Sequence, residues 1–174
     1  REVLGAHYTR LRPNVKAPTP VLVAHSEEVA AMCGMSKADV ASEAFLKMFS
    51  GSPPAAQECW ATAYGASFAG SYGGQRGDGR AISLGQTNEL ELQLKGGGRM
   101  PYCRGGDGRT VLRSSVREFL AQELMHALGV PTSRSLTLYM SQTETVRRPW
   151  YSENSRSFNP DVMVSNPVAI STRV

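Results

Sequence analysis

The chain has 174 residues, of which 41% are hydrophobic and 20% are charged, and its formal net charge is +4. This is the composition of an ordinary globular domain, and no apolar run is long enough to cross a bilayer as a helix. Cys33, Cys59 and Cys103 lie far apart, which excludes a metal-type spacing, argues against a disulfide framework and favours a reducing compartment. The small positive charge suits an anionic ligand, but solvated surface arginines explain it equally well.

Residues 1–60 are predicted to form a helical N-terminal extension. Ser26 has the character of a helix N-cap, with acidic residues in the turn that follows. Ser36 and Asp39 have the spacing of a capping box, and the Gly-Ser-Pro-Pro segment at 51–54 ends the second helix.

Two strands joined as a tight hairpin are predicted after a segment, 61–79, that has too few apolar residues for a helix. Residues 81–84 form a short strand and 85–88 a turn. Apolar and polar residues then alternate from 89 to 95, which places successive side chains on opposite faces of a second strand. One face carries Leu90, Leu92 and Leu94, and the other ends in Lys95.

The next helix gives the strongest signal in the chain. Ser115 is its predicted N-cap, with Glu118 three residues later, and Gly129 and Pro131 end it. We expect one apolar stripe to face the core. It contains Val116, Phe119, Leu120, Leu124, Ala127 and Leu128.

The remaining residues are predicted to form two strands with a long connection between them. Residues 135–140 and 168–174 have the apolar content of strands. Residues 145–167 are polar and lack a regular period, so we expect an irregular connection.

Lys95 and Glu118 form the pair with the most chemical meaning. Lys95 leaves its strand opposite the leucines, and Glu118 lies opposite the centre of the apolar stripe of its helix. We expect the two charges to meet in a cleft, where a lysine contacts nucleotide phosphates and a glutamate fixes the lysine. Alternatively, Glu118 completes the cap with Ser115, Lys95 is a solvated strand end, or Glu123 is its partner.

Two further groups of residues suggest phosphate contacts. In Gly-Asp-Gly-Arg at 77–80, the glycines let backbone amides approach a phosphate and Arg80 adds a fork of donors. The segment matches neither a Walker loop nor a complete kinase glycine loop, so a simple tight turn is its alternative. The second group is a run of arginines, for which a solvated basic edge is the ordinary interpretation. It consists of Arg104, Arg109, Arg113 and Arg117.

The order of four blocks closely resembles the selenoprotein O family. These are Gly-Asp-Gly-Arg-Ala at 77–81, Leu-Gln-Leu-Lys-Gly-x-Gly-Arg-x-Pro at 92–101, Gly-Asp-Gly-Arg-x-Val-Leu-Arg-Ser-Ser-x-Arg-Glu-Phe-Leu at 106–120, and His-Ala-Leu-Gly-Val-Pro-Thr-x-Arg at 126–134. The resemblance implies an α+β fold, the small N-terminal lobe of a protein kinase, with an antiparallel sheet and an αC-type helix. This lobe would span 61–174, and the large lobe lies outside the chain.

The resemblance also implies an enzyme, a protein adenylyltransferase that uses ATP and Mg²⁺. Such proteins bind ATP in a flipped orientation and transfer AMP to Ser, Thr or Tyr hydroxyls of protein substrates. Lys95 matches the family's nucleotide-binding lysine and Glu118 its ion-pair partner, and we assign both to catalysis. The other matching positions are nucleotide contacts, namely Gly77, Gly79, Arg80, Asp107, Gly108 and Arg173.

Several groups that the resemblance implies are absent from this chain. They are a second arginine, the catalytic aspartate, the metal-binding Asn/Asp pair and a C-terminal Cys or selenocysteine segment. We therefore expect no metal ligand among these 174 residues, and no AMP transfer by them alone.

The sequence leaves two other functions open. One is a catalytically inactive, pseudokinase-type module that binds ATP without turnover. The other is a nucleic-acid binder, which is disfavoured because aromatics are sparse near the arginines and no recognition-helix or zinc pattern occurs. We expect no membrane partner. The connection at 147–167 resembles that of eukaryotic members, which are mitochondrial, whereas bacterial members are cytoplasmic.

Overall fold

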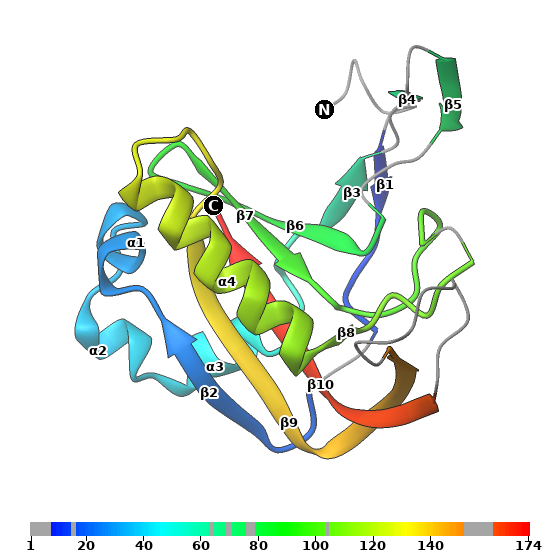
Figure 1. Ribbon diagram of the computed structural model, residues 1–174. Coiled ribbons are helices and arrows are strands. Elements are labelled where there is room, and N and C mark those ends of the chain that lie inside the picture. Colours follow the sequence, from blue (N-terminus) through cyan, green and yellow to red (C-terminus); the bar gives the residue numbers. More distant parts are fainter. Residues whose placement is uncertain are drawn as a thin grey trace.

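The structure, a computed structural model, is built on an eight-stranded sheet in which all strand pairs are antiparallel (Figure 1). The strand order is β1-β3-β6-β7-β10-β9-β2, with β8 paired to β10. The predicted α+β class with an antiparallel sheet is thus confirmed. The structure describes residues 8–14, 17–62, 65–68, 71–75, 79–103, 105–151 and 162–174.

The elements of the sheet come from both halves of the chain. The sheet consists of β1 (Tyr8–Arg10), β2 (Pro20–His25), β3 (Trp60–Thr62), β6 (Ala81–Thr87), β7 (Leu90–Lys95), β8 (Thr110–Val111), β9 (Ser135–Trp150) and β10 (Val162–Arg173). A separate hairpin pairs β4 (Gly65–Phe68) with β5 (Ser71–Gln75). The helices are α1 (Glu27–Met32), α2 (Lys37–Val40), α3 (Glu43–Phe49) and α4 (Leu112–Ala127). None of these described helices is long and apolar enough to span a membrane.

The first sixty residues contain the predicted helices but are not helical throughout. Ser26 caps α1, and Ser36 and Asp39 form the predicted capping box at the start of α2. Two strands were not predicted: β1 pairs with β3, and β2 pairs with β9 more than a hundred residues away. Local periodicity did not indicate them, because a short strand at the edge of a sheet is defined by its distant partner.

The predicted hairpin is present as β6 and β7. The strands extend further than expected, through Thr87, and the turn is made by Asn88 and Glu89, whose φ angles are 45° and 67°. Leu92 and Leu94 are buried, as the alternation indicated. The two faces of β7 therefore have different neighbours.

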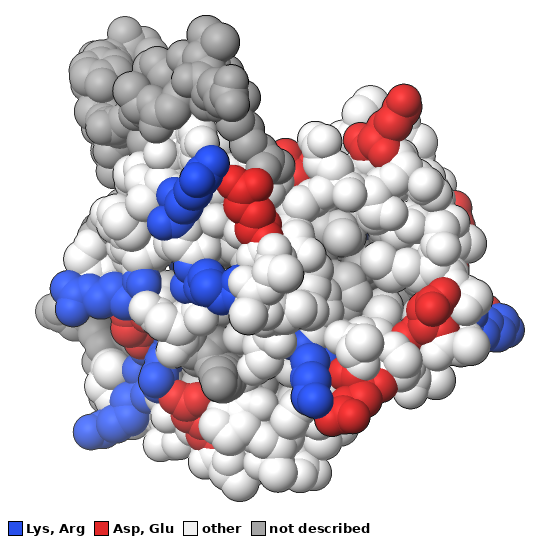
Figure 2. Space-filling view, turned by 180° about the vertical axis from the view of Figure 1, so that it is seen from behind, with Lys and Arg blue, Asp and Glu red and all other residues white. Residues whose placement is uncertain are grey.

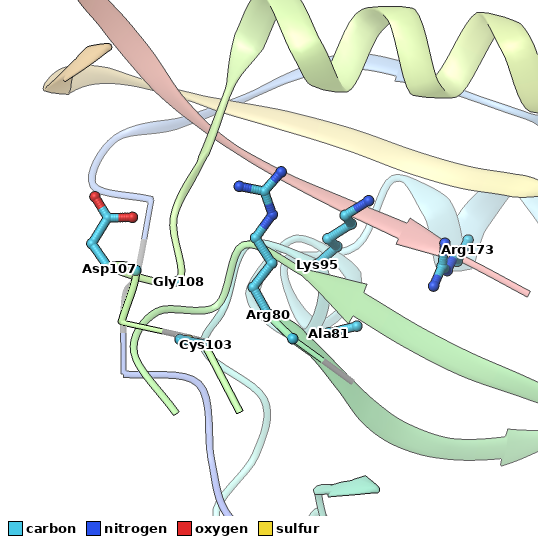
Figure 3. Close-up of a pocket in the computed structure, with 9 residues that line it drawn as sticks. Arg80, Ala81, Lys95, Cys103, Asp107, Gly108 and Arg173 are labelled. Atoms are coloured by element: carbon cyan, nitrogen blue, oxygen red, sulfur yellow. The ribbon is translucent and has the colours of Figure 1, made fainter. Parts of the chain in front are cut away.

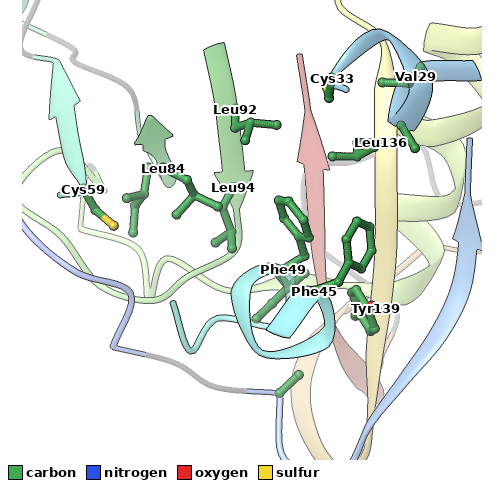
Figure 4. Close-up of a cluster of buried hydrophobic side chains, with 14 of the residues drawn as sticks. Val29, Cys33, Phe45, Phe49, Cys59, Leu84, Leu92, Leu94, Leu136 and Tyr139 are labelled. Carbon is green, nitrogen blue, oxygen red and sulfur yellow. The ribbon is translucent and has the colours of Figure 1, made fainter. Parts of the chain in front are cut away.

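The leucine face of β7 lies in the hydrophobic core. Phe45 and Phe49 of α3 pack edge to face, with ring centroids 4.6 Å apart, in one cluster with Leu94 and Tyr139 (Figure 4). Helix α4 crosses the opposite face of the sheet (Figure 1). Because side chains alternate along a strand, the residues beside the buried leucines point toward α4.

The connection predicted at 145–167 is a long hairpin in its described part. β9 continues to Trp150, β10 begins at Val162, and the register runs from Thr145↔Pro167 to the pair Trp150↔Val162. Polar side chains occupy both faces of this extension, so it gave no strand period in the sequence.

Helix α4 differs from the prediction in its start and in the face that it buries. It begins at Leu112, with Val111 at the N-cap position and no side-chain cap, while Ser115 is buried inside the helix. Leu120, Leu124 and Leu128, which were expected to face the core, are 63%, 60% and 66% exposed. The polar face of α4 meets the sheet instead, because ionic and hydrogen-bonding partners are available there.

A buried arginine fastens α4 to the rest of the fold. Arg134, only 6% exposed, donates to Glu123 at 3.1 and 2.9 Å and to Glu28 of α1 at 3.1 Å. Glu123 also accepts a hydrogen bond from the Ser135 amide at 2.9 Å. The bonds from Arg134 hold the pKa of Glu123 below its ordinary value, and the same contacts raise the pKa of Arg134. These bonds set the position of α4 over the sheet.

Replacing Glu123 with Gln should lower the free energy of unfolding by about 2 kcal/mol at pH 7, because a hydrogen bond to a charged group contributes roughly 1.5–3 kcal/mol. The lowered pKa stabilises the fold above pH 4.5, the ordinary pKa of a glutamate, and this contribution disappears as pH falls through the folded value. Urea unfolding at pH 7 and pH 3 should show the gap between wild type and variant narrowing in acid. Glu91→Gln, which changes an exposed glutamate of β7, is the control. If Glu123→Gln were as stable as wild type at pH 7, the bonds between Glu123 and Arg134 would not stabilise the fold.

Candidate functional site

Lys95 and Glu118 are in direct contact, as the sequence predicted. The Lys95 ammonium lies 2.6 and 2.5 Å from the two carboxylate oxygens of Glu118, and the side chains are 22% and 29% exposed. Lys95 ends β7 on the face opposite Leu94, and Glu118 comes from the second turn of α4. The three alternatives fail: α4 begins before Ser115, Lys95 is bound to Glu118 and only 22% exposed, and Glu123 is bound to Arg134.

Arg173 lies next to this pair at the end of β10. Its Nε and Nη2 donate to Oε1 of Gln93 at 2.8 and 2.5 Å, and Nη1 lies 3.6 Å from Glu118. Glu118 therefore faces two cations from two strands. Sequence reasoning missed the part played by Gln93, although its position two residues before Lys95 places both on one face of β7.

A cavity of about 420 Å³ opens beside these side chains (Figure 3). Arg80 and Lys95 both project toward α4, while Asp107 and Arg173 lie at opposite ends (Figure 3). Gly77 lies outside the described residues, and Glu118 contacts Lys95 but is not among the residues that line the cavity. The lining consists of Gly79, Arg80, Ala81, Lys95, Cys103, Gly106, Asp107, Gly108 and Arg173, of which Ala81, Cys103 and Gly106 were not predicted.

The charges that line the cavity are mainly positive. Arg80 uses one nitrogen, Nη1, to donate to the Arg109 carbonyl at 2.9 Å. Asp107 is the one carboxylate in the described lining, and it is bound by Arg148 at 2.7 Å and by the Arg109 amide at 3.0 Å. Burial would raise the pKa of Asp107, but these bonds outweigh it and hold the pKa below its ordinary value. On the rear of the molecule, lysine and arginine gather toward the side that carries this loop and the end of the β9–β10 hairpin (Figure 2).

Gly108 has a structural requirement besides any contact with a ligand. Its φ is +70°, and a Cβ added to it would lie 1.9 Å from the carbonyl oxygen of Gly98. The Gly98 amide also donates to the Gly108 carbonyl at 3.3 Å. The absence of a side chain thus lets two loops touch at the edge of the cavity.

The donor set suits a polyphosphate. Guanidinium groups bind phosphate oxygens through paired N–H donors, and a lysine fixed by a carboxylate presents a localised positive charge. Among the described residues, no three His, Cys, Asp or Glu side chains converge in a way that could hold a metal ion. The carboxylates of Glu118 and Asp107, the two described at the cavity, are already paired with cations, so this lining fits anion binding.

A family match and the individual relatives of this chain agree with each other. Residues 1–159 match the family described as "Protein adenylyltransferase SelO". The chain is 48% identical over 163 residues to a protein nucleotidyltransferase YdiU of Azoarcus sp., covering 90% of this chain and 31% of that protein. Identities to the proteins of that name from Xanthomonas euvesicatoria and Xanthomonas axonopodis are 47% and 50% over 158 residues, covering 87% of this chain and 30% of each.

These relatives are all protein nucleotidyltransferases by name, and the chain spans about a third of their length. The chain belongs to the protein adenylyltransferase SelO family, and the resemblance seen in the sequence is confirmed. The relatives are bacterial, which argues against the mitochondrial location suggested by residues 147–167.

Replacing Gly108 with Ala should destabilise the protein by at least about 2 kcal/mol, because positive φ and overpacking each cost roughly 1–3 kcal/mol. Gly105→Ala is a matched control, since Gly105 has φ +80° but no atom within 4 Å of its added Cβ. Thermal unfolding of both variants separates backbone strain from the clash. Equal losses in the two variants would show that the contact with Gly98 is unimportant.

Proposed function

We propose that residues 61–174 form the nucleotide-binding small lobe of a protein-kinase-like enzyme that transfers AMP from ATP to Ser, Thr or Tyr hydroxyls of proteins. The observation that carries the proposal is the Lys95–Glu118 contact beside a cavity lined by Arg80 and Arg173. A strand lysine paired with a helix glutamate is the arrangement that holds nucleotide phosphates in protein kinases. The names of the relatives support transfer of a nucleotide to a protein.

In this reaction, the oxygen of a protein hydroxyl attacks the α-phosphorus of ATP. The bond from the α-phosphorus to the bridging oxygen breaks, pyrophosphate leaves, and the hydroxyl proton passes to a base. Catalysis of this type depends on positioning and on stabilising negative charge. Both carboxylates that the structure describes at the cavity are occupied, Glu118 by Lys95 and Asp107 by Arg148. The base is therefore assigned to residues outside this lobe, and we expect residues 1–174 alone to transfer no AMP.

Each cationic side chain of the cavity makes its own contact with the nucleotide. Lys95 holds phosphate oxygens and Glu118 orients its ammonium. Arg80 and Gly79 cover the phosphates, and Gly77, which the sequence assigns to the same contact, lies outside the described residues. Arg173, held in place by Gln93, contacts the end of the nucleotide farthest from Asp107.

Asp107 and Gly108 are assigned to the opposite end of the cavity from Arg173. The Asp107 carboxylate is already bound to Arg148, so the Asp107–Arg148 ion pair forms the wall of the cavity at this end. Mg²⁺ would neutralise phosphate charge when bound. We assign its ligands to residues outside this chain, because both described carboxylates beside the cavity are paired.

A second function uses the same cavity without turnover: a pseudokinase-type module that binds ATP as a structural ligand. It would rely on the same cationic contacts as the enzyme. The two functions are separated by the appearance of covalently attached label on proteins, and no property of the lobe alone distinguishes them.

Lys95→Ala in the full-length protein should reduce transfer of label from α-labelled ATP to proteins by at least about a hundredfold, because the ammonium is lost from the phosphates. The variant should still fold, since Glu118 keeps Arg173 as a neighbour at 3.6 Å. Lys47→Ala, which removes an exposed lysine of α3, is the control and should retain activity. Tight ATP binding by the wild type with no label on protein would favour the pseudokinase-type module.

A further inference from the structure

A second cavity, of about 450 Å³, lies beside the first and has a strongly basic lining. Arg80 lines both cavities, so the two are adjacent. The volume is in the range of known ligand sites. None of the described lining residues is acidic; they are Arg80, Val111, Arg113, Ser114, Arg117, Arg148, Pro149 and Tyr151.

Two of the arginines are held in place by their surroundings. Arg113 donates through Nη2 to the Pro149 carbonyl at 2.7 Å, and its guanidinium carbon lies 4.9 Å from the centre of the Trp150 ring. Arg148 is bound to Asp107. Side chains that are already ordered lose less conformational entropy when a ligand binds. The β9–β10 hairpin thus supplies a rigid wall against the start of α4.

Arg117 follows Arg113 by four residues and lies on the same exposed face of α4. In the part of the chain that the structure describes, Arg117 has no hydrogen bond or ion pair. Like charges at this spacing repel each other, and a guanidinium has five N–H donors and no acceptor. An anion between the two arginines would supply acceptors and relieve the repulsion.

The start of α4 adds to this positive field. Val111 is the N-cap residue and makes no side-chain capping bond, and α4 has 16 residues. The amides of the first turn of a helix lack intrahelical partners, and the helix dipole is positive at that end. The backbone therefore favours an anion in the same cavity as the arginines.

We propose that this cavity binds an acidic side chain of the protein substrate, close to the hydroxyl that receives the nucleotide. The inference rests on the proposed function and adds a substrate class to it: hydroxyl residues that are flanked by Asp or Glu. Shared lining through Arg80 places the acidic residue next to the nucleotide. The exposed positions of Arg113 and Arg117 let a polypeptide reach them from solvent, and the Trp150 face is taken by Arg113, which disfavours base stacking by a nucleic acid.

The test is peptide binding by the full-length protein in the presence of ATP, measured by fluorescence anisotropy. Two labelled peptides share one serine, with either Asp and Glu or Asn and Gln around it. We expect the acidic peptide to bind at least tenfold more tightly. Arg117→Gln should weaken its binding about fivefold, as expected for loss of one exposed charge pair worth about 1 kcal/mol, and Arg117→Lys should retain part of the affinity. Binding of the neutral peptide should be unchanged.

Arg147→Gln is the matched control, because it removes one exposed positive charge from the neighbouring strand position outside the cavity. Equal binding of the two peptides, or equal loss in Arg147→Gln and Arg117→Gln, would overturn the proposal. If Arg117→Gln bound ATP more weakly than wild type, the second cavity would hold part of the nucleotide and not the substrate, and the proposal would be overturned. If the acidic preference depends on Arg117 but no labelled product forms from α-labelled ATP, the binding site stands and the proposed transfer fails.

Discussion

The contact between Lys95 and Glu118 is the interaction on which the site depends. Both side chains are largely removed from solvent, and a charge in that position is costly unless an opposite charge accompanies it. Glu118 also faces Arg173, so one carboxylate connects β7, α4 and β10. Without it, two cations from neighbouring strands would repel each other at the wall of the cavity. The same carboxylate that orders the lobe therefore keeps a lysine available for an anionic ligand.

The alternation of β7 divides the molecule into a core and a binding face. Leu92 and Leu94 meet the aromatic residues of α3 on one side, while Gln93 and Lys95 point toward α4 on the other. The bonds of Arg134 to Glu123 and Glu28 hold α4 with its polar face toward the sheet. The apolar side chains on the outer face of α4 therefore stay exposed. A helix that buried its leucines here would have turned Glu118 away from Lys95, because these residues lie on opposite sides of α4.

The acidic residues beside the two cavities form ion pairs that hold an arginine and a lysine in position. Asp107 holds Arg148 between the loop before α4 and the long hairpin, and Glu118 holds Lys95. Arg113 and Arg117 have no carboxylate partner among the described residues. Although the net charge of the chain is only +4, four arginines line the cavity where α4 begins, with no acidic residue in the described lining. This distribution explains why composition alone was uninformative about a ligand.

The sequence by itself determined the hairpin of β6 and β7, the helix caps at Ser26 and Ser36, and the meeting of Lys95 with Glu118, because these follow from local periodicity and from motifs in a recognisable order. Tertiary structure decided the rest. It selected the buried face of α4, where Ser115 is buried and the bonds of Glu123 to Arg134 and Ser135 outweighed an apolar stripe. It also placed β2 beside β9 and brought the hairpin arginine Arg148 to Asp107 and to α4. Such pairings join residues that are distant along the chain, and no local pattern records the energy of a contact with a remote partner.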